Sequence, residues 1–168
     1  AMVEEILEMV NKNGAKGIKI HPANGHFYPS DMSMWPVYRI AEQLDLPIIS
    51  HTGISQTPSG TEHARPSHFS EVLVSFPKLK LILAHLVNGF FNESLELARN
   101  YPNIYFDTSA VIAGMPKGPL SDEEIVNLIR KIGAERVLFG SDFPWFDPRP
   151  SIAHLIRLPL TYEEKSLI

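Results

Sequence analysis

Residues 47–53 read Pro47-Ile48-Ile49-Ser50-His51-Thr52-Gly53, a short apolar run that ends in a histidine and then reaches a glycine. The run is too short for a helix and is rich in isoleucine, which favours a buried β-strand. Gly53 allows the backbone to turn sharply out of such a strand. The segment therefore predicts a strand that delivers His51 to the start of a tight loop.

Four further segments repeat this pattern of an apolar run with a polar tip. The five predicted strands cover residues 17–20, 47–50, 79–84, 104–106 and 137–140. The side chains that follow them are His21, His51, His85, Asp107 and Asp142. Each strand is thus expected to end in a group that can bind a metal ion or transfer a proton.

Helical patterns separate these runs. Apolar residues recur at helical spacing in residues 2–11, 31–44, 67–76, 92–100, 121–132 and 161–168. Ser121 and Glu124 match a capping box, and Gly133 is a stop signal. Alternating strands and helices favour an α/β fold with a parallel sheet. The carboxyl ends of parallel strands converge on one rim, so the five polar tips are expected to meet there.

Composition limits the class of protein. The net charge of -4 gives no field that attracts nucleic acid or an anionic membrane. The chain has no cysteine, which excludes a disulfide framework, a thiolate zinc site and a cysteine nucleophile. No apolar run approaches the roughly 18 residues of a membrane span, and no signal peptide is recognisable. We therefore expect a cytoplasmic protein that binds neither nucleic acid nor membranes.

Other functions on an α/β fold require motifs that the sequence lacks. A dinucleotide-binding domain would carry Gly-x-Gly-x-x-Gly after its first strand, and a nucleotide-binding loop would carry Gly-x-x-x-x-Gly-Lys-Ser/Thr. A serine hydrolase of this class would carry Gly-x-Ser-x-Gly. None of the three occurs here.

The polar tips suggest metal chemistry. A single histidine after a strand is more often a loop residue than a ligand, but three at equivalent positions favour a shared site. Neutral imidazole and carboxylate hold Zn²⁺ with an open coordination position. His51 is the best candidate ligand, and Asp142 is the next, as ligand or proton acceptor. His85 could ligate the metal or act as acid or base, and its spacing does not decide between the two.

Three further residues are candidates for substrate binding. Lys19 and His21 share one face of their strand, because side chains alternate along a strand. Trp145 follows the Asp142 motif and could form a pocket wall. For Lys19 and His21 a structural hydrogen bond is slightly favoured over substrate binding. Trp145 could equally serve packing, and Asp107 could simply cap the following loop.

Taken in order, several motifs resemble a known family. They are Gly17-Ile18-Lys19-Ile20-His21-Pro22, His51-Thr52-Gly53, the strand before His85, and Gly140-Ser141-Asp142-Phe143-Pro144. The set resembles the amidohydrolase-related metal-dependent hydrolases, a group that includes aminocarboxymuconate-semialdehyde decarboxylase. The resemblance implies a (β/α)8 barrel of the triosephosphate isomerase (TIM) type. It also implies metal ligation by His51 and Asp142, catalytic roles for His85 and Asp142, and a divalent cofactor, with Zn²⁺ expected.

The family's first strand carries a His-x-His pair, and no such pair occurs in this sequence. A full barrel takes about 250 residues, whereas this chain has 168. We therefore expect residues 1–168 to form a single partial barrel domain that holds about strands 4–8.

The predicted activity is hydrolysis or non-oxidative decarboxylation of a small carboxylated or cyclic substrate through a metal-activated water. The alternative is a catalytically impaired, truncated remnant that folds by self-association. Both readings predict a homo-oligomer, because an open sheet exposes its edges.

Overall fold

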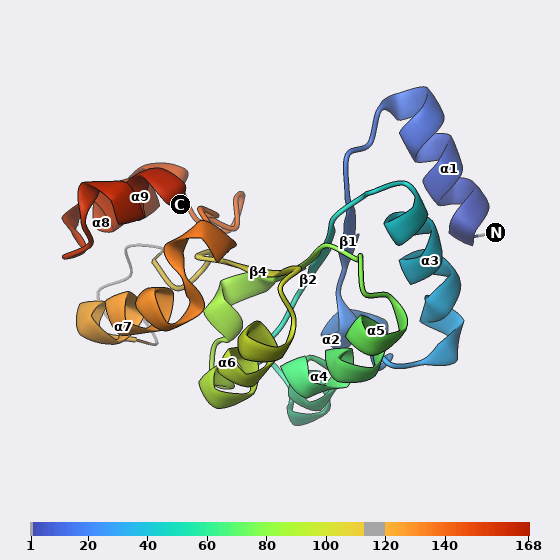
Figure 1. The fold of residues 1–168 in the computed structure, drawn as a ribbon, viewed down its shortest axis with the longest axis horizontal. Coiled ribbons are helices and arrows are strands. Elements are labelled where there is room, and N and C mark those ends of the chain that lie inside the picture. Colours follow the sequence, from blue (N-terminus) through green and yellow to red (C-terminus); the bar gives the residue numbers. More distant parts are fainter. Residues whose placement is uncertain (1, 113–119) are drawn as a thin grey trace.

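The computed structural model describes residues 2–112 and 120–168, and in these ranges five parallel strands form one sheet (Figure 1). Their order in the sheet is their order in the chain. The strands are β1 (Ile18–Ile20), β2 (Ile48–Ser50), β3 (Leu81–Leu83), β4 (Ile104–Asp107) and β5 (Val137–Leu138). A doubly wound sheet reverses its strand order at a switch point, whereas a barrel does not. The prediction of a partial barrel is thereby confirmed.

Helices follow the strands around the outside of the sheet (Figure 1). In chain order they are α1 (Met2–Asn13), α2 (Pro22–Gly25), α3 (Trp35–Gln43), α4 (Pro58–His63), α5 (Ser70–Ser75), α6 (Phe91–Asn100), α7 (Asp122–Ile132), α8 (Pro148–Arg157) and α9 (Tyr162–Leu167). Short 3-10 turns are η1 (Met32–Met34), η2 (Pro66–Phe69), η3 (Ala84–Val87) and η4 (Ala134–Arg136). The assignment of the whole chain to one domain stays a prediction.

The two faces of the sheet differ in burial. Residues of the outer row lie against the helices and are fully buried: Ile48, Leu81, Leu83, Ile104 and Phe106. The register places Lys19, Ile49, Ile82 and Tyr105 side by side on the inner row. Of these four, Lys19 is exposed, and Ile49 and Tyr105 are only half-buried. The hydrophobic core therefore lies between sheet and helices, while the inner face is open.

The boundaries of several elements were predicted incorrectly. The strands predicted at 79–84 and 137–140 span only 81–83 and 137–138. The helix predicted from residue 31 begins as the 3-10 turn η1 and becomes α-helical at Trp35. Parallel strands end where their backbone pairing ends, so apolar residues beyond the paired region do not extend them.

Three helices, α2, α4 and α8, were not predicted. In α8, Pro148 occupies the first turn, where its missing N–H costs no hydrogen bond, and Asp147 caps the helix. In α4, Thr57 is the N-cap and Pro58 again occupies the first turn. The capping box of Ser121 and Glu124 is confirmed at the start of α7.

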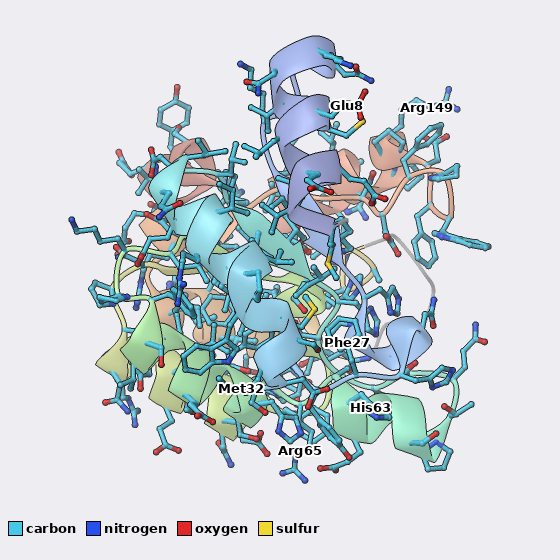
Figure 2. All side chains as sticks on the ribbon, turned by 90° about the vertical axis from the view of Figure 1, so that its right-hand side faces the viewer. Glu8, Phe27, Met32, His63, Arg65 and Arg149 are labelled. Atoms are coloured by element: carbon cyan, nitrogen blue, oxygen red, sulfur yellow. The ribbon has the colours of Figure 1, made fainter. Side chains whose placement is uncertain are left out.

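Helix α4 and the turn after it are fixed to α6 through one side chain. Arg65 forms a salt bridge with Glu93, and its guanidinium lies 5.0 Å from the centre of the Phe90 ring. Figure 2 shows Arg65 and His63 at the end of the molecule opposite Glu8 of α1. This contact joins the turn after α4 to the start of α6.

No helix in the described ranges has both the length and the apolar surface needed to cross a membrane.

Gly53 offers a direct test of how the loop after β2 is built. Its φ is +112°, and a Cβ there would lie 2.6 Å from the carbonyl oxygen of Asn88. Gly14 also has a positive φ, +69°, but a Cβ would meet nothing within 4 Å. We expect Gly14→Ala to cost about 1–2 kcal/mol, the penalty for a left-handed non-glycine residue. Gly53→Ala should cost clearly more, as measured by urea unfolding; equal costs would contradict the described backbone contact.

Candidate functional site

A cavity of about 660 Å³ opens at the carboxyl ends of the strands. Its lining includes every side chain that the sequence predicted for the site: Lys19, His21, His51, His85, Asp142 and Trp145. The pairing of Ile20 with Ser50 and of Ser50 with Leu83 brings the first three strand ends level. Parallel pairing thus gathers residues that lie more than 120 positions apart in the sequence, as the strand-tip pattern predicted.

His51 lies at the centre of this group. Its ring stacks on that of His21, with 4.1 Å between ring centres and 7° between planes. Its Nδ1 lies 3.0 Å from Nε2 of His85. Its Nε2 is buried and has no hydrogen-bond partner among the described residues. A buried imidazole nitrogen without a partner is a suitable ligand atom for a metal ion.

Burial and neighbouring positive charges favour the neutral form of His51 and His21. Burial, together with the positive potential of His21, His85 and Lys19, lowers the pKa of His51 to about 3. Burial, followed by the nearby Lys19 ammonium, also lowers the pKa of His21. Only neutral imidazole has a lone pair for a metal ion. The site therefore holds His51 in the form that ligation requires.

His85 has both ring nitrogens engaged. Nε2 contacts His51, and Nδ1 lies 2.9 Å from the hydroxyl and 3.2 Å from the carbonyl oxygen of Ser109. The backbone of His85 is left-handed, with φ +67°, and its N–H donates to the carboxylate of Asp107. Both roles that the sequence left open, metal ligation and acid–base chemistry, would require one of these contacts to be exchanged.

Lys19 and His21 are arranged to contact a substrate. The ammonium of Lys19 forms no ion pair with a described acidic residue, and it lines the same cavity as the imidazoles. On the open inner face of the sheet, Lys19 is exposed. Nδ1 of His21 accepts the backbone N–H of Asn24, so its proton is on Nε2 and available for donation.

Asp142 and two aromatic residues after it also line the cavity. Asp142 has a positive φ of 66°, and its carboxylate accepts no hydrogen bond from a described residue. Trp145 and Phe146 line the cavity beside it. Trp145 is 82% exposed and Phe143 is 74% exposed. Exposed rings beside a polar cavity provide a surface on which a flat, apolar molecule could stack.

The residues present fit a metal ion only in part. His51 supplies one nitrogen ligand and Asp142 supplies one carboxylate at the same cavity. Within residues 2–112 and 120–168, no group of three or more histidine and acidic side chains is close enough to hold an ion. Catalytic zinc sites use three protein ligands. The described residues therefore provide two candidate ligands and not a complete coordination sphere.

Several residues of the site were not identified from the sequence. Ser109, two positions after Asp107, was not identified. Its role depends on a contact with His85, which follows a different strand, and the sequence does not show that contact. Asn24, Ser55 and Gln56 also line the cavity and add hydrogen-bonding groups. Asn24 follows the His21-Pro22 motif closely, which is a usable signal. Ser55 and Gln56 lie between β2 and α4, where no motif marked them.

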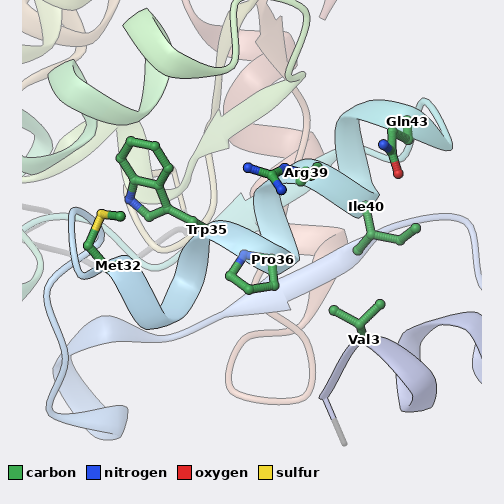
Figure 3. Close-up of a pocket in the computed structure, with 7 residues that line it drawn as sticks. All are labelled: Val3, Met32, Trp35, Pro36, Arg39, Ile40 and Gln43. Atoms are coloured by element: carbon green, nitrogen blue, oxygen red, sulfur yellow. The ribbon is translucent and has the colours of Figure 1, made fainter.

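A second cavity, of about 330 Å³, is lined by Val3 of α1 and by residues of η1 and α3, and by none of the imidazoles of the larger cavity (Figure 3). Its lining is mostly apolar, and Arg39 is its one charged residue among those shown. It offers no acid, base or ligand cluster, so the chemistry belongs to the larger cavity.

Comparison with known proteins places the chain in a family. The amidohydrolase family, Amidohydro_2, matches residues 1–168. The chain belongs to the amidohydrolase family. The predicted resemblance is thereby confirmed, and with it membership of a family of enzymes.

Solved structures similar to this chain share its fold. An uncharacterized TIM-barrel protein from Bordetella bronchiseptica is 20% identical, with a TM-score of 0.83, over 98% of this chain and 58% of its own. A dihydroxybenzoic acid decarboxylase from Polaromonas sp. JS666, solved with manganese and 2-nitroresorcinol, is 16% identical with a TM-score of 0.75. That match covers 99% of this chain and 61% of the decarboxylase.

Among curated proteins, "Protein fluG" of Emericella nidulans is 23% identical over 62% of this chain and 12% of its own length. The chain therefore spans less than two thirds of the length of each of these relatives.

Metal binding can be tested with a matched pair of substitutions. His51→Asn removes the proposed nitrogen ligand, while His26→Asn changes an exposed histidine whose left-handed backbone asparagine tolerates. We expect His51→Asn to lower the affinity for Mn²⁺ by more than the about 10–100-fold typical of residues outside the ligand shell. Titration calorimetry of the metal-free proteins measures this. Equal affinities in the two variants would exclude His51 as a ligand.

Proposed function

We propose that the chain carries the active site of a divalent-metal-dependent enzyme that hydrolyses or decarboxylates a small cyclic carboxylate. The observation that supports this most is the single cavity in which Lys19, His21, His51, His85 and Asp142 gather. Membership of the amidohydrolase family supports the same class of enzyme. The chemistry that follows is assigned to these five side chains.

The metal ion is proposed to bind His51 and Asp142. The buried, unpartnered Nε2 of His51 and the free carboxylate of Asp142 support this pair. A divalent ion at this position would polarise a substrate oxygen and lower the pKa of a coordinated water. Zn²⁺ was expected from the resemblance, while the similar decarboxylase from Polaromonas was solved with manganese. Both ions therefore belong in the first binding experiments.

Substrate recognition is proposed to rest on charge at one side and aromatic surface at the other. Lys19 would bind a carboxylate of the substrate, because it is the cation at the cavity and has no acidic partner in the described ranges. Nε2–H of His21 would donate a hydrogen bond to the same ligand. Trp145 would stack against a ring, which its exposed position permits.

Proton transfer is proposed for His85 and Asp142. In decarboxylation, the bond between the ring carbon and the carboxylate breaks, CO₂ leaves, and the ring carbon takes a proton. In hydrolysis, water adds to a carbonyl and the leaving group takes a proton. Either reaction needs one group that holds a proton near the substrate, and both residues line the cavity.

A second candidate is a protein of this fold that binds ligands without turnover. The absence of a three-ligand group within the described residues favours it. The two candidates separate in one assay, in which the Mn²⁺- and Zn²⁺-loaded proteins are incubated with hydroxybenzoates and with cyclic esters. Release of CO₂ or of acid supports the enzyme; binding of these compounds without either product supports the second candidate.

Self-association and a cytoplasmic location stay predictions. The open inner face of the sheet, with Ile49 and Tyr105 half-buried, supports association with a second copy. The chain mass is 18.9 kDa, so light scattering should give at least twice that value. A stable monomer would contradict the prediction.

The role of Lys19 can be tested against a matched lysine. Lys16 is exposed and has no ion-pair partner among the described residues, but it does not line the cavity. Lys19→Met should weaken binding of a carboxylate ligand by about tenfold, the loss expected for one charged hydrogen bond of about 1.5 kcal/mol at an open site. Lys16→Met should leave it unchanged. Equal effects of the two substitutions would remove Lys19 from the proposed site.

A further inference from the structure

A chain of hydrogen bonds runs behind the cavity, starting at Asp107 at the end of β4. One oxygen of its carboxylate, Oδ1, accepts the backbone N–H of His85 at 2.9 Å and that of Ser109 at 3.0 Å. The same oxygen also accepts the hydroxyl proton of Ser109. A carboxylate can only accept, so the direction of this last bond is fixed. The Ser109 hydroxyl is therefore left with lone pairs on its other side.

These lone pairs determine where the proton of His85 resides. Nδ1 of His85 lies 2.9 Å from the Ser109 hydroxyl oxygen and 3.2 Å from the Ser109 carbonyl oxygen. Both oxygens are acceptors here, so Nδ1 has to be the donor. In the neutral ring, Nε2 of His85 then has no proton and carries a lone pair.

The contact with His85 also determines which nitrogen of His51 carries the proton. Nε2 of His85 lies 3.0 Å from Nδ1 of His51. Because Nε2 of His85 accepts, Nδ1 of His51 donates, and the proton of the neutral His51 ring is accounted for. Nε2 of His51 is then the unprotonated nitrogen, and it is the buried atom that lacks a partner in the described structure.

We infer that Asp107 and Ser109 are positioning residues that set the tautomers of His85 and His51 and so prepare Nε2 of His51 to bind a metal ion. With the Asp107 carboxylate ionised and the His85 ring neutral, these contacts allow one order of protons along the four residues. A ligating histidine commonly donates its second N–H to a fixed acceptor, which orients the ring and defines the tautomer. Here that acceptor is Nε2 of His85, and the tautomer of His85 is in turn set by its bond to Ser109.

Backbone geometry supports the same assignment. His85 and Leu86 both have positive φ values, +67° and +44°, which are uncommon for residues other than glycine. The bond from the His85 N–H to Asp107 holds this conformation. Asp107 thereby fixes the backbone of His85, and through Ser109 it also fixes the ring.

The experiment is ¹⁵N–¹H nuclear magnetic resonance of metal-free protein labelled at histidine, since long-range couplings show which ring nitrogen carries the proton. In the wild type, His85 and His51 should both be protonated at Nδ1. A wild-type spectrum with either proton on Nε2 overturns the inference without any variant. The tautomer part does not depend on activity, whereas the metal part rests on the proposed function.

Substitutions then test whether Ser109 and Asp107 set the tautomers of His85 and His51. Ser109→Ala removes the nearer of the two acceptors of His85 Nδ1 and leaves the carbonyl oxygen at 3.2 Å. It should therefore reduce the share of Nδ1-protonated His85 and His51 and lower Mn²⁺ affinity by about 10–100-fold. Asp107→Asn keeps a side-chain oxygen that can accept, and should retain the wild-type tautomers. Ser94→Ala is the control, because Ser94 is also buried and its hydroxyl donates to the carbonyl of Phe90, away from the cavity.

Unchanged tautomers in Ser109→Ala would overturn the positioning role. Wild-type tautomers as inferred, but without Mn²⁺ binding, would contradict the proposed function and leave the tautomer assignment standing. The two failures are thus distinguishable in the same samples.

Discussion

Backbone hydrogen bonds between parallel strands hold Ile20, Ser50, Leu83 and Phe106 at the same level of the sheet. Every candidate residue of the site depends on this register. A slip of one residue would turn each side chain to the other face of the sheet. The polar side chain that follows each strand would then lie among the helices, where an unpaired imidazole or carboxylate is costly. The burial of the outer row therefore fixes the site as well as the core.

The open inner face explains the electrostatics of the cavity. Helices bury the outer row, but Lys19 on the inner row stays hydrated. Its charge nevertheless reaches the imidazoles and lowers the pKa of His21 and of His51. Among the described residues, the cavity combines the neutral imidazoles of His21 and His51 with the Lys19 ammonium and the Asp142 carboxylate, which suits an anionic ligand beside a metal ion. Burial and the Lys19 charge thus both lower the pKa of His21 and of His51.

The sequence was sufficient to predict the fold class and that Lys19, His21, His51, His85, Asp142 and Trp145 gather at one cavity. Apolar runs and their polar tips repeat in a fixed order, and parallel pairing converts that order into proximity. The helix α8 was not recognised, because Pro148 reads as a helix breaker unless its position in the first turn is known. Ser109 was not recognised for a different reason. Its importance lies in contacts with Asp107 and His85, and the contact with His85 joins residues 24 positions apart.

The account depends most on which atoms hold the metal ion. The direct test is a crystal structure of the protein grown with Mn²⁺, with anomalous scattering used to locate the ion. The account predicts an ion bonded to Nε2 of His51 and to a carboxylate oxygen of Asp142, with His85 still bonded to Ser109. An ion bonded to His85, or to Nδ1 of His51, or outside this cavity would contradict it.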